Sequence, residues 1–208
     1  MGTEILLYVP NIIGYFRLIL LIISLVFFHH PLWFLLFYGL SVLLDGFDGY
    51  FARRLNQVSD FGAWLDLMVD LISRGSLWCM LYKWGYIVMM LEWTTFVCTH
   101  ARGKNWKVIE KEKFPTICKL VMAKNFRTVW GAMAIGGVFI LPIWLYAYDT
   151  HFLHEYLLAP RCVVYAGIAL LSAARALAAS VEVCFIYFHI QQMLLEKKPK
   201  HDTDGILE

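Results

Sequence analysis

The sequence has few charged residues, and its cysteines follow no pattern that could organise a small domain. Charged residues make up 16% of the 208 positions, whereas hydrophobic residues make up 60%. The five cysteines are scattered, odd in number and without Cys-x-x-Cys spacing, which argues against both a disulfide framework and a zinc site. This composition is too apolar for an ordinary soluble domain, and we therefore expect a single membrane domain.

Two signals of N-terminal processing are also missing. The chain begins Met-Gly-Thr-Glu-Ile-Leu, without the Ser or Thr at the sixth position that favours myristoylation. No basic segment precedes the first apolar run, and no small-residue cleavage site follows it. We therefore expect this run to be retained as a membrane span.

Long apolar runs separated by turn residues fill most of the chain. They predict an all-α, polytopic integral membrane protein with six transmembrane helices. The expected spans are residues 12–28, 32–52, 61–82, 86–100, 129–148 and 162–190. Residues 1–193 would form the membrane domain, and residues 194–208 a polar cytoplasmic tail.

Basic residues are distributed unevenly between the two sides that six spans would create. The side with both chain ends would hold thirteen Lys and Arg, at positions 53–54, 102–127 and 197–200. The opposite side would hold only Lys83 and Arg161. The positive-inside rule therefore places the basic side in the cytoplasm, where the lysine-rich stretch 102–127 would contact anionic lipid headgroups.

Four aspartates interrupt the apolar sequence between residues 45 and 70. Asp45 and Asp48 are three residues apart, and Asp66 and Asp70 are four apart, so each pair lies on one face of its helix. Two such faces opposed across a tight turn would direct four carboxylates at one point. Oxygen ligands in this number suit Mg²⁺ or Mn²⁺, and could hold two ions roughly 3.5–4 Å apart.

A structural interpretation of the same acids is that they are helix-end carboxylates paired with Arg53, Arg54 or Arg74. We favour the metal site because ionised groups between apolar runs are costly and usually functional. Small residues at positions 46, 49, 52 and 62 leave room for a bulky headgroup, and Arg53 could contact phosphate oxygens. Together these features predict phosphoryl transfer at a membrane surface.

The same residues reproduce a family signature, D-x2-D-G-x2-A-R-x8-G-x3-D-x3-D, over positions 45–70. The chain thus resembles the CDP-alcohol phosphotransferases. The resemblance implies that four carboxylates ligate two divalent ions, and that Asp70 is also the general base that activates an acceptor hydroxyl to displace CMP. It also implies a homodimer. The residues implied as metal ligands are Asp45, Asp48, Asp66 and Asp70, and those implied at the CDP site are Gly49, Ala52, Arg53 and Gly62.

The opening V-P-N-I-I-G-Y-F-R at residues 9–17 is similar to that of the phosphatidylinositol synthase branch of this family, and it adds Asn11 to the expected substrate-site residues. The resemblance implies transfer of a phosphatidyl group from CDP-diacylglycerol to a polyol, myo-inositol, in the endoplasmic reticulum with the active site facing the cytoplasm. Membrane lipids would be partners, and nucleic acid would not.

The likeness weakens after Asp70, where Leu71 replaces the arginine usual in these enzymes. The acceptor therefore stays open: glycerol phosphate, choline and ethanolamine types are alternatives within the family. A catalytically silent paralogue that binds CDP-lipid or a partner enzyme is an alternative outside catalysis. If the likeness to the eukaryotic enzymes does not hold, a bacterial inner membrane would be the compartment.

Several single charges lie elsewhere in the apolar spans. We interpret Arg74 as an ion-pair partner that orients Asp70. Arg175 and Glu182 are seven residues apart on one helix face, and we expect them to pair through a neighbouring helix, with substrate contact as the alternative. His151 and His154 are expected on the side away from the acids, as surface residues.

Overall fold

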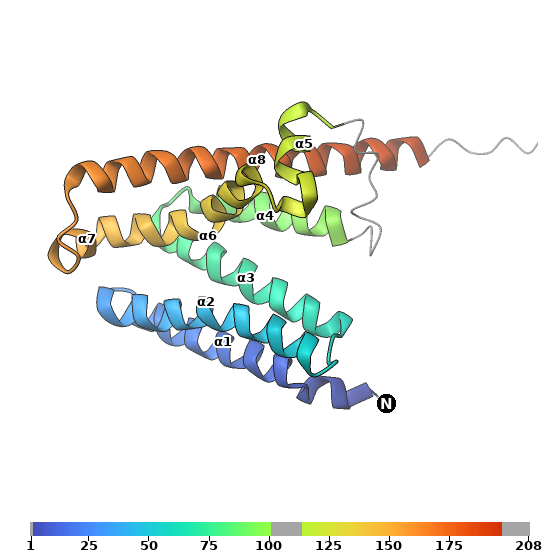
Figure 1. Cartoon of the computed structure of the whole chain (residues 1–208), viewed down its shortest axis with the longest axis horizontal. Helices are drawn as coiled ribbons and strands as arrows, with labels where there is room; N and C mark the ends of the chain where they lie inside the picture. Colours follow the sequence, from blue (N-terminus) through green and yellow to red (C-terminus); the bar gives the residue numbers. More distant parts are fainter. Residues whose placement is uncertain (1, 101–113, 197–208) are drawn as a thin grey trace, which may run out of the picture.

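The computed structural model describes residues 2–100 and 114–196, and these ranges fold into helices joined by short turns. This confirms the predicted all-helical class. The elements in chain order are η1 Gly2–Leu7, α1 Val9–Val26, α2 Pro31–Arg54, α3 Asp60–Leu81, α4 Gly85–His100, α5 Thr116–Met122, η4 Ala123–Phe126, α6 Val129–Asp149, α7 Phe152–Glu155 and α8 Arg161–Glu196 (Figure 1).

Residues that favour helix starts fix several of these boundaries. Pro10 and Pro31 lie in the first turns of α1 and α2, where a missing backbone N–H costs nothing. The Ser59 hydroxyl accepts a hydrogen bond from the Gly62 N–H at 3.0 Å and caps α3. Thr128 caps α6 in the same way, through Gly131 at 3.1 Å. These caps determine the residues at which α3 and α6 begin.

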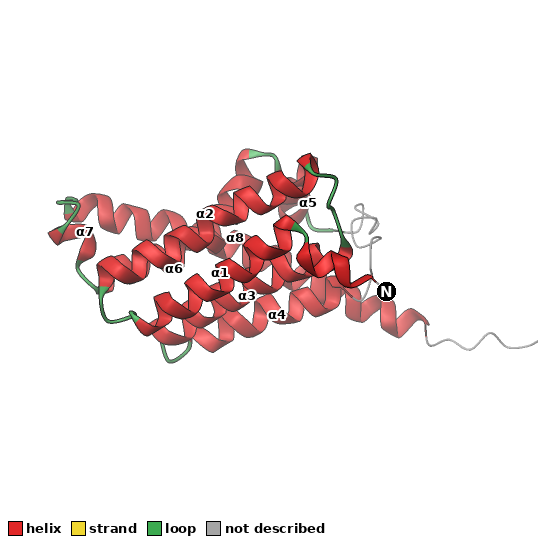
Figure 2. Cartoon of the chain, turned by 90° about the horizontal axis from the view of Figure 1, so that it is seen from below, coloured by secondary structure: helices red, strands yellow, loops and turns green. Residues whose placement is uncertain are grey.

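The long helices lie side by side, and α3 runs between the α1–α2 pair and the α6–α8 pair (Figures 1 and 2). One end of the molecule carries η1 and the turn between α2 and α3, and we call it the acid end. The opposite end carries α7, with His151 and His154, and we call it the histidine end. The two histidines therefore lie away from the acids, as predicted.

Four helices are long and apolar enough to cross a membrane: α1, α2, α6 and α8. Helix α3 has 22 residues, but Asp66, Asp70 and Arg74 interrupt its apolar character. Helix α4 has 16 residues and is about 24 Å long, less than the roughly 30 Å hydrocarbon thickness of a bilayer. Six spans stay a prediction.

Among the three clusters of buried side chains in the described residues, two join helices that carry or border the site. One joins the first three long helices to α6 through residues that include Leu21, Phe34, Leu77 and Tyr146, and the Tyr146 hydroxyl donates to the Phe28 carbonyl at 2.6 Å. The other packs α5 between α6 and α8. The first cluster packs the helices together at the histidine end. The apolar packing there leaves the polar side chains of the site toward the acid end.

The second cluster brings together two cysteines that are far apart in the sequence. The sulfurs of Cys118 and Cys184 lie 2.8 Å apart, and all five cysteines are free thiols. Burial raises the pKa of the Cys118 thiol to about 12, so the thiol stays protonated near neutral pH. This side chain therefore behaves as a small apolar packing residue.

Some predictions concern residues outside the described ranges. The basic residues from Arg102 to Lys113 and the tail lysines at positions 197–200 belong to this group. Within the described ranges, α8 continues to Glu196, so its last three residues belong to the predicted tail.

Candidate metal and substrate site

The four aspartates lie in the second half of one helix and the first half of the next. Asp45 and Asp48 come from α2, and Asp66 and Asp70 come from α3. The short turn between these helices includes Asn56 with a φ of 54°, a conformation that asparagine tolerates better than most residues. Asp45, Asp48 and Asp66 each place an oxygen within 4.8 Å of the others.

The side chain of Arg17, from α1, joins all four acids. Its Nη1 lies 2.7 Å from Asp48 Oδ2 and 2.6 Å from Asp66 Oδ1. Its Nη2 lies 2.7 Å from both Asp45 Oδ1 and Asp70 Oδ1. The guanidinium therefore stands at the point where the carboxylates converge, and the fourth acid, Asp70, is tied to the other three through it.

The sequence of α1 places Arg17 there. Asn11, Gly14 and Arg17 recur at three-residue spacing and are all buried, so they share the face that packs on the neighbouring helices. A side chain at Gly14 would begin 3.0 Å from the Leu65 side chain, so glycine lets α1 approach α3. The Ser41 hydroxyl donates to the Arg17 carbonyl at 3.1 Å and fixes α2 against the same turn.

The four carboxylates differ in their access to the outside. The exposed fractions of the Asp66 and Asp45 side chains are 48% and 38%, whereas those of Asp48 and Asp70 are 8% and 17%. The Arg17 side chain is only 2% exposed. The site is thus closed toward the helix interior and open along one edge.

The residues at this point fit a hard divalent cation. Every donor is a carboxylate oxygen, the ligand that Mg²⁺ and Mn²⁺ prefer. The carboxylates already converge on a positive group, because the Arg17 guanidinium lies within 2.7 Å of each. A cation is therefore the species this arrangement stabilises.

The residues predicted at the substrate site fall into two sets. Gly49, Ala52 and Arg53 lie on the last turns of α2, and the exposed Arg53 guanidinium lies 3.6 Å from where a side chain at Gly49 would begin. Its side chain forms no hydrogen bond or ion pair with other residues of the ranges 2–100 and 114–196. Arg53 is therefore a cation at the acid end that is open to a ligand.

Asn11 and Gly62 form the second set and lie where α1 meets α3. The Asn11 side chain is 1% exposed, and its Nδ2 donates to the Ile5 carbonyl at 2.5 Å. A side chain at Gly62 would begin 2.8 Å from Asn11 Oδ1. The structure thus shows these two residues in helix packing next to the acids.

A cavity of about 640 Å³ adjoins the acids. Arg17, Asp45, Asp70 and Arg74 form its polar wall, and α6 supplies an apolar wall. Arg127, from the connection before α6, also lines it. The volume lies within the range of small-molecule sites in proteins, and a polar wall opposite an apolar wall suits a molecule with a charged head and apolar chains.

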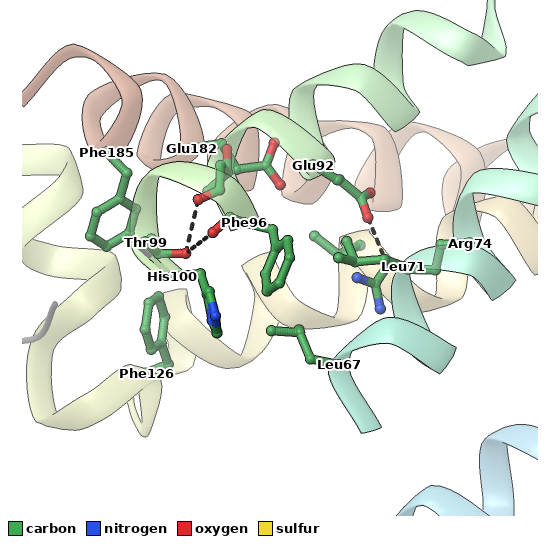
Figure 3. A pocket seen from close by; sticks show the side chains of 12 residues that line it. Leu67, Leu71, Arg74, Glu92, Phe96, Thr99, His100, Phe126, Glu182 and Phe185 are labelled. Atoms are coloured by element: carbon green, nitrogen blue, oxygen red, sulfur yellow. Dashed lines mark hydrogen bonds and ion pairs between the residues drawn. The ribbon is translucent and has the colours of Figure 1, made fainter. Parts of the chain in front are cut away.

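A second charged network begins at Asp70 and continues into the bundle. Figure 3 shows its Arg74–Glu92 ion pair. Arg74 Nη1 lies 3.5 Å from Asp70 Oδ2, and Arg74 Nε donates to Glu92 Oε2 at 2.9 Å. Arg175 Nη2 lies 3.4 Å from Glu92 Oε1, and Arg175 Nη1 donates to Glu182 Oε2 at 3.0 Å. The expected contact of Arg74 with Asp70 is confirmed. Arg175 contacts the neighbouring helix α4 through Glu92, as expected, but it also pairs with Glu182 directly.

This network borders a smaller cavity of about 330 Å³, and Leu71 lies in its wall (Figure 3). Leu71, the residue directly after Asp70, is apolar and buried. Arg74, one turn later, is the nearest cation to Asp70 on α3.

Comparison with known proteins decides the family. The family model for CDP-alcohol phosphatidyltransferases matches residues 7–187. The chain belongs to this family. As a CDP-alcohol phosphatidyltransferase family member it carries the acid motif inside the matched region, and the helices of that motif are the ones that converge on Arg17.

Several curated relatives are similar to part of this family member. It is 52% identical to CDP-diacylglycerol–inositol 3-phosphatidyltransferase of Candida albicans over 75 residues, 36% of this chain and 33% of the relative. It is 51% identical to the Homo sapiens protein of that name over 79 residues, 38% and 36% of the two chains. The alignments thus span about a third of these relatives' length. No solved structure matches.

Sequence reasoning did not assign Arg17 to the site, although the residue ends the motif at positions 9–17. The available signal was that Arg17 is the only charge in residues 12–28, because lone charges in apolar spans usually have a partner or a function. The partner could not be identified from spacing, since the contact crosses between α1 and the two helices that follow.

Proposed function

We propose that this protein transfers the phosphatidyl group of CDP-diacylglycerol to a polyol, myo-inositol, to give phosphatidylinositol and CMP. The observation that carries the proposal is the convergence of four carboxylates from α2 and α3 beside a cavity of about 640 Å³. The names of the relatives support inositol as the acceptor. The whole activity is a proposal for this chain, because the alignments cover only about a third of the relatives' length.

Asp70 is the proposed general base. Its carboxylate lines the larger cavity and contacts two guanidinium groups, those of Arg17 and Arg74. In the reaction the acceptor oxygen attacks the β-phosphorus, the acceptor proton passes to Asp70, and the bond from the β-phosphorus to the CMP oxygen breaks. Arg74, on the same helix, holds the carboxylate in place, and a positioned base contributes typically 10²–10⁴-fold to such steps.

Asp45, Asp48, Asp66 and Asp70 are the proposed ligands of Mg²⁺ or Mn²⁺, with two ions as the proposed number. When bound there, the cation would supply charge stabilisation for the diphosphate and its leaving group. Arg53 is the proposed fork donor to phosphate oxygens at the acid end. Gly49, Ala52, Gly62 and Asn11 shape the neighbouring helix surfaces in this proposal.

The proposed setting is a six-span homodimer in the endoplasmic reticulum, with the acid end in the cytoplasm. The support is the excess of basic residues expected at that end and the position of the acids at the end opposite α7 (Figure 1). The acyl chains of CDP-diacylglycerol would then lie along the apolar wall of the cavity that α6 provides.

An acceptor scan with purified protein in lipid nanodiscs tests the proposal. CDP-diacylglycerol labelled in the cytidine would be incubated with Mn²⁺ and with myo-inositol, glycerol 3-phosphate or no acceptor; CDP-choline and CDP-ethanolamine would be offered with diacylglycerol in separate reactions. We expect CMP release that depends on myo-inositol and is lost in Asp70→Asn. Release with another acceptor would replace inositol but keep the reaction class, and no acceptor-dependent release in any mixture would reject the enzyme.

A further inference from the structure

We infer that Arg17 is a built-in counter-cation that occupies the metal position in the metal-free protein and leaves the carboxylates when divalent ions bind. The inference rests on the proposed function, because it takes the four aspartates as metal ligands. It adds that α1 contributes a residue that competes with the metal.

An ion at the point where the four carboxylates converge would compete with Arg17 for the same oxygens. Each terminal nitrogen of Arg17 contacts two carboxylates at 2.6–2.7 Å. These four oxygens would also be the ones that face a bound ion, and Mg²⁺ binds carboxylate oxygens at about 2.0–2.1 Å. A cation with such short bonds and a guanidinium cannot share one point, so one must displace the other.

The charge balance explains why a resident cation is needed. Without Arg17, four carboxylates would face one another beside helices that are largely apolar. Among residues 2–100 and 114–196, Arg74, at 3.5 Å from Asp70, would be the one remaining cation in contact with them. Like charges this close repel strongly at low dielectric. The guanidinium therefore keeps α2 and α3 together while no metal is bound.

The structure also provides a place for the displaced side chain. Arg17 lines the cavity of about 640 Å³ next to the acids, so it can move away from the carboxylates without leaving the site. Its buried Nε has no hydrogen-bond partner within the described part of the chain, which leaves one donor unsatisfied in the metal-free arrangement. In the cavity the guanidinium would meet an anionic phosphate group, and a planar fork suits bidentate phosphate contact.

A counter-cation of this kind lowers metal affinity and raises the stability of the metal-free protein. Removal of the charge should therefore have opposite effects on the two quantities. A residue with a purely structural role would not behave in this way, because its removal would weaken both. This opposition is the basis of the test.

The test measures Mn²⁺ binding by electron paramagnetic resonance on the full chain in detergent, for the wild type, Arg17→Met, Arg17→Lys and Asp66→Asn. We expect Arg17→Met to bind Mn²⁺ about tenfold more tightly than the wild type, a typical size for coupling between competing ligands, and to unfold at a lower temperature without metal. Arg17→Lys keeps the charge and should stay close to the wild type. Equal or weaker binding by Arg17→Met would overturn the inference.

A measurement on the wild type covers the case in which Arg17→Met does not fold. Phenylglyoxal modification of arginines would be mapped by mass spectrometry with and without Mn²⁺. We expect Arg17 to be protected without metal and to become reactive when Mn²⁺ is added, while Arg175, which is buried in the second network, stays protected in both. Unchanged reactivity of Arg17 after Mn²⁺ binding would overturn the inference.

The two proposals fail in different ways. If Mn²⁺ binding is lost in Asp66→Asn but is the same in Arg17→Met and the wild type, the proposed function stands and the counter-cation is rejected. Absence of Mn²⁺ binding by every protein rejects the metal site itself, and the counter-cation with it.

Discussion

Two neighbouring arginines at the end of α2 have different surroundings. The Arg54 guanidinium bonds to the Tyr50 hydroxyl and lies 5.7 Å from the centre of that ring. Arg53 lies on the face with Gly49 and forms no such contact among the described residues. A side chain held by its own helix has less freedom to bind a ligand, so only Arg53 is placed for a phosphate.

The Arg53→Ala and Arg54→Ala variants test this difference. We expect Arg53→Ala to raise the KM for CDP-diacylglycerol about tenfold or more, because a hydrogen bond to a charged group contributes about 1.5–3 kcal/mol. Arg54→Ala is the matched control and should change the KM by less than about threefold, the effect of a weak exposed contact. Equal effects of the two variants on KM would contradict the assignment of Arg53.

The buried charges of the bundle illustrate what a residue-level analysis could and could not predict. The spacing of Arg175 and Glu182 placed both on one helix face and predicted a shared partner on a neighbouring helix, but not their direct contact. Glu92 and Arg17 meet partners from other helices, and no local rule connects positions that are dozens of residues apart. Such contacts depend on how the helices pack, and residue spacing along one helix does not show which helices are neighbours.

At the scale of helices, a glycine lets α6 approach the α8 backbone closely at Arg175. A side chain at Gly137 would begin 2.4 Å from the Arg175 backbone nitrogen. The neighbouring Gly136 has only the Ile140 side chain, at 3.8 Å, within reach. The two helices therefore approach closely at Gly137 and not at Gly136, as small residues permit in membrane helix pairs.

Gly137→Ala should lower the unfolding temperature in detergent, with a loss of about 1–3 kcal/mol typical of overpacking. Gly136→Ala is the control in the same helix, and its unfolding temperature should be unchanged or slightly higher, because alanine has the higher helix propensity by about 1 kcal/mol. If Gly137→Ala were as stable as the control, the close approach of α6 to α8 would be wrong.

The helices themselves were largely predictable because apolar runs and proline or glycine breaks define their limits. The acid motif also fixed the faces of α2 and α3, since spacings of three and four residues are helical repeats. The number of spans was less predictable. Helix α3 carries functional charges in its apolar face, and α4 is short, so the features that mark a span in sequence are weak in these two helices.

At the scale of the whole molecule, the proposed orientation places the two ends of the bundle on opposite sides of the membrane. Val58, in the turn between α2 and α3, is 72% exposed at the acid end. Leu158, between α7 and α8, is 82% exposed at the histidine end. These two positions are therefore suitable reporters of orientation.

Single cysteines at these positions test the orientation. In a background with the exposed Cys79 and Cys162 changed to serine, Val58→Cys in sealed microsomes should react with a membrane-impermeant maleimide added outside. Leu158→Cys should react only after the membrane is permeabilised. Labelling of both from outside would contradict a bundle that spans the membrane, and the reverse pattern would place the acids in the lumen.

The central claim is that the carboxylates from α2 and α3 form a metal site at which inositol displaces CMP. The most direct measurement is inositol-dependent CMP release by the wild-type protein in nanodiscs, before EDTA treatment, after it, and after Mn²⁺ is added back. We predict that CMP release is lost with EDTA and restored by Mn²⁺. Asp70→Asn should be inactive in all three conditions. Asp149→Asn, which changes an exposed aspartate, should behave as the wild type. Release that survives EDTA, or that does not depend on inositol, would contradict the central claim.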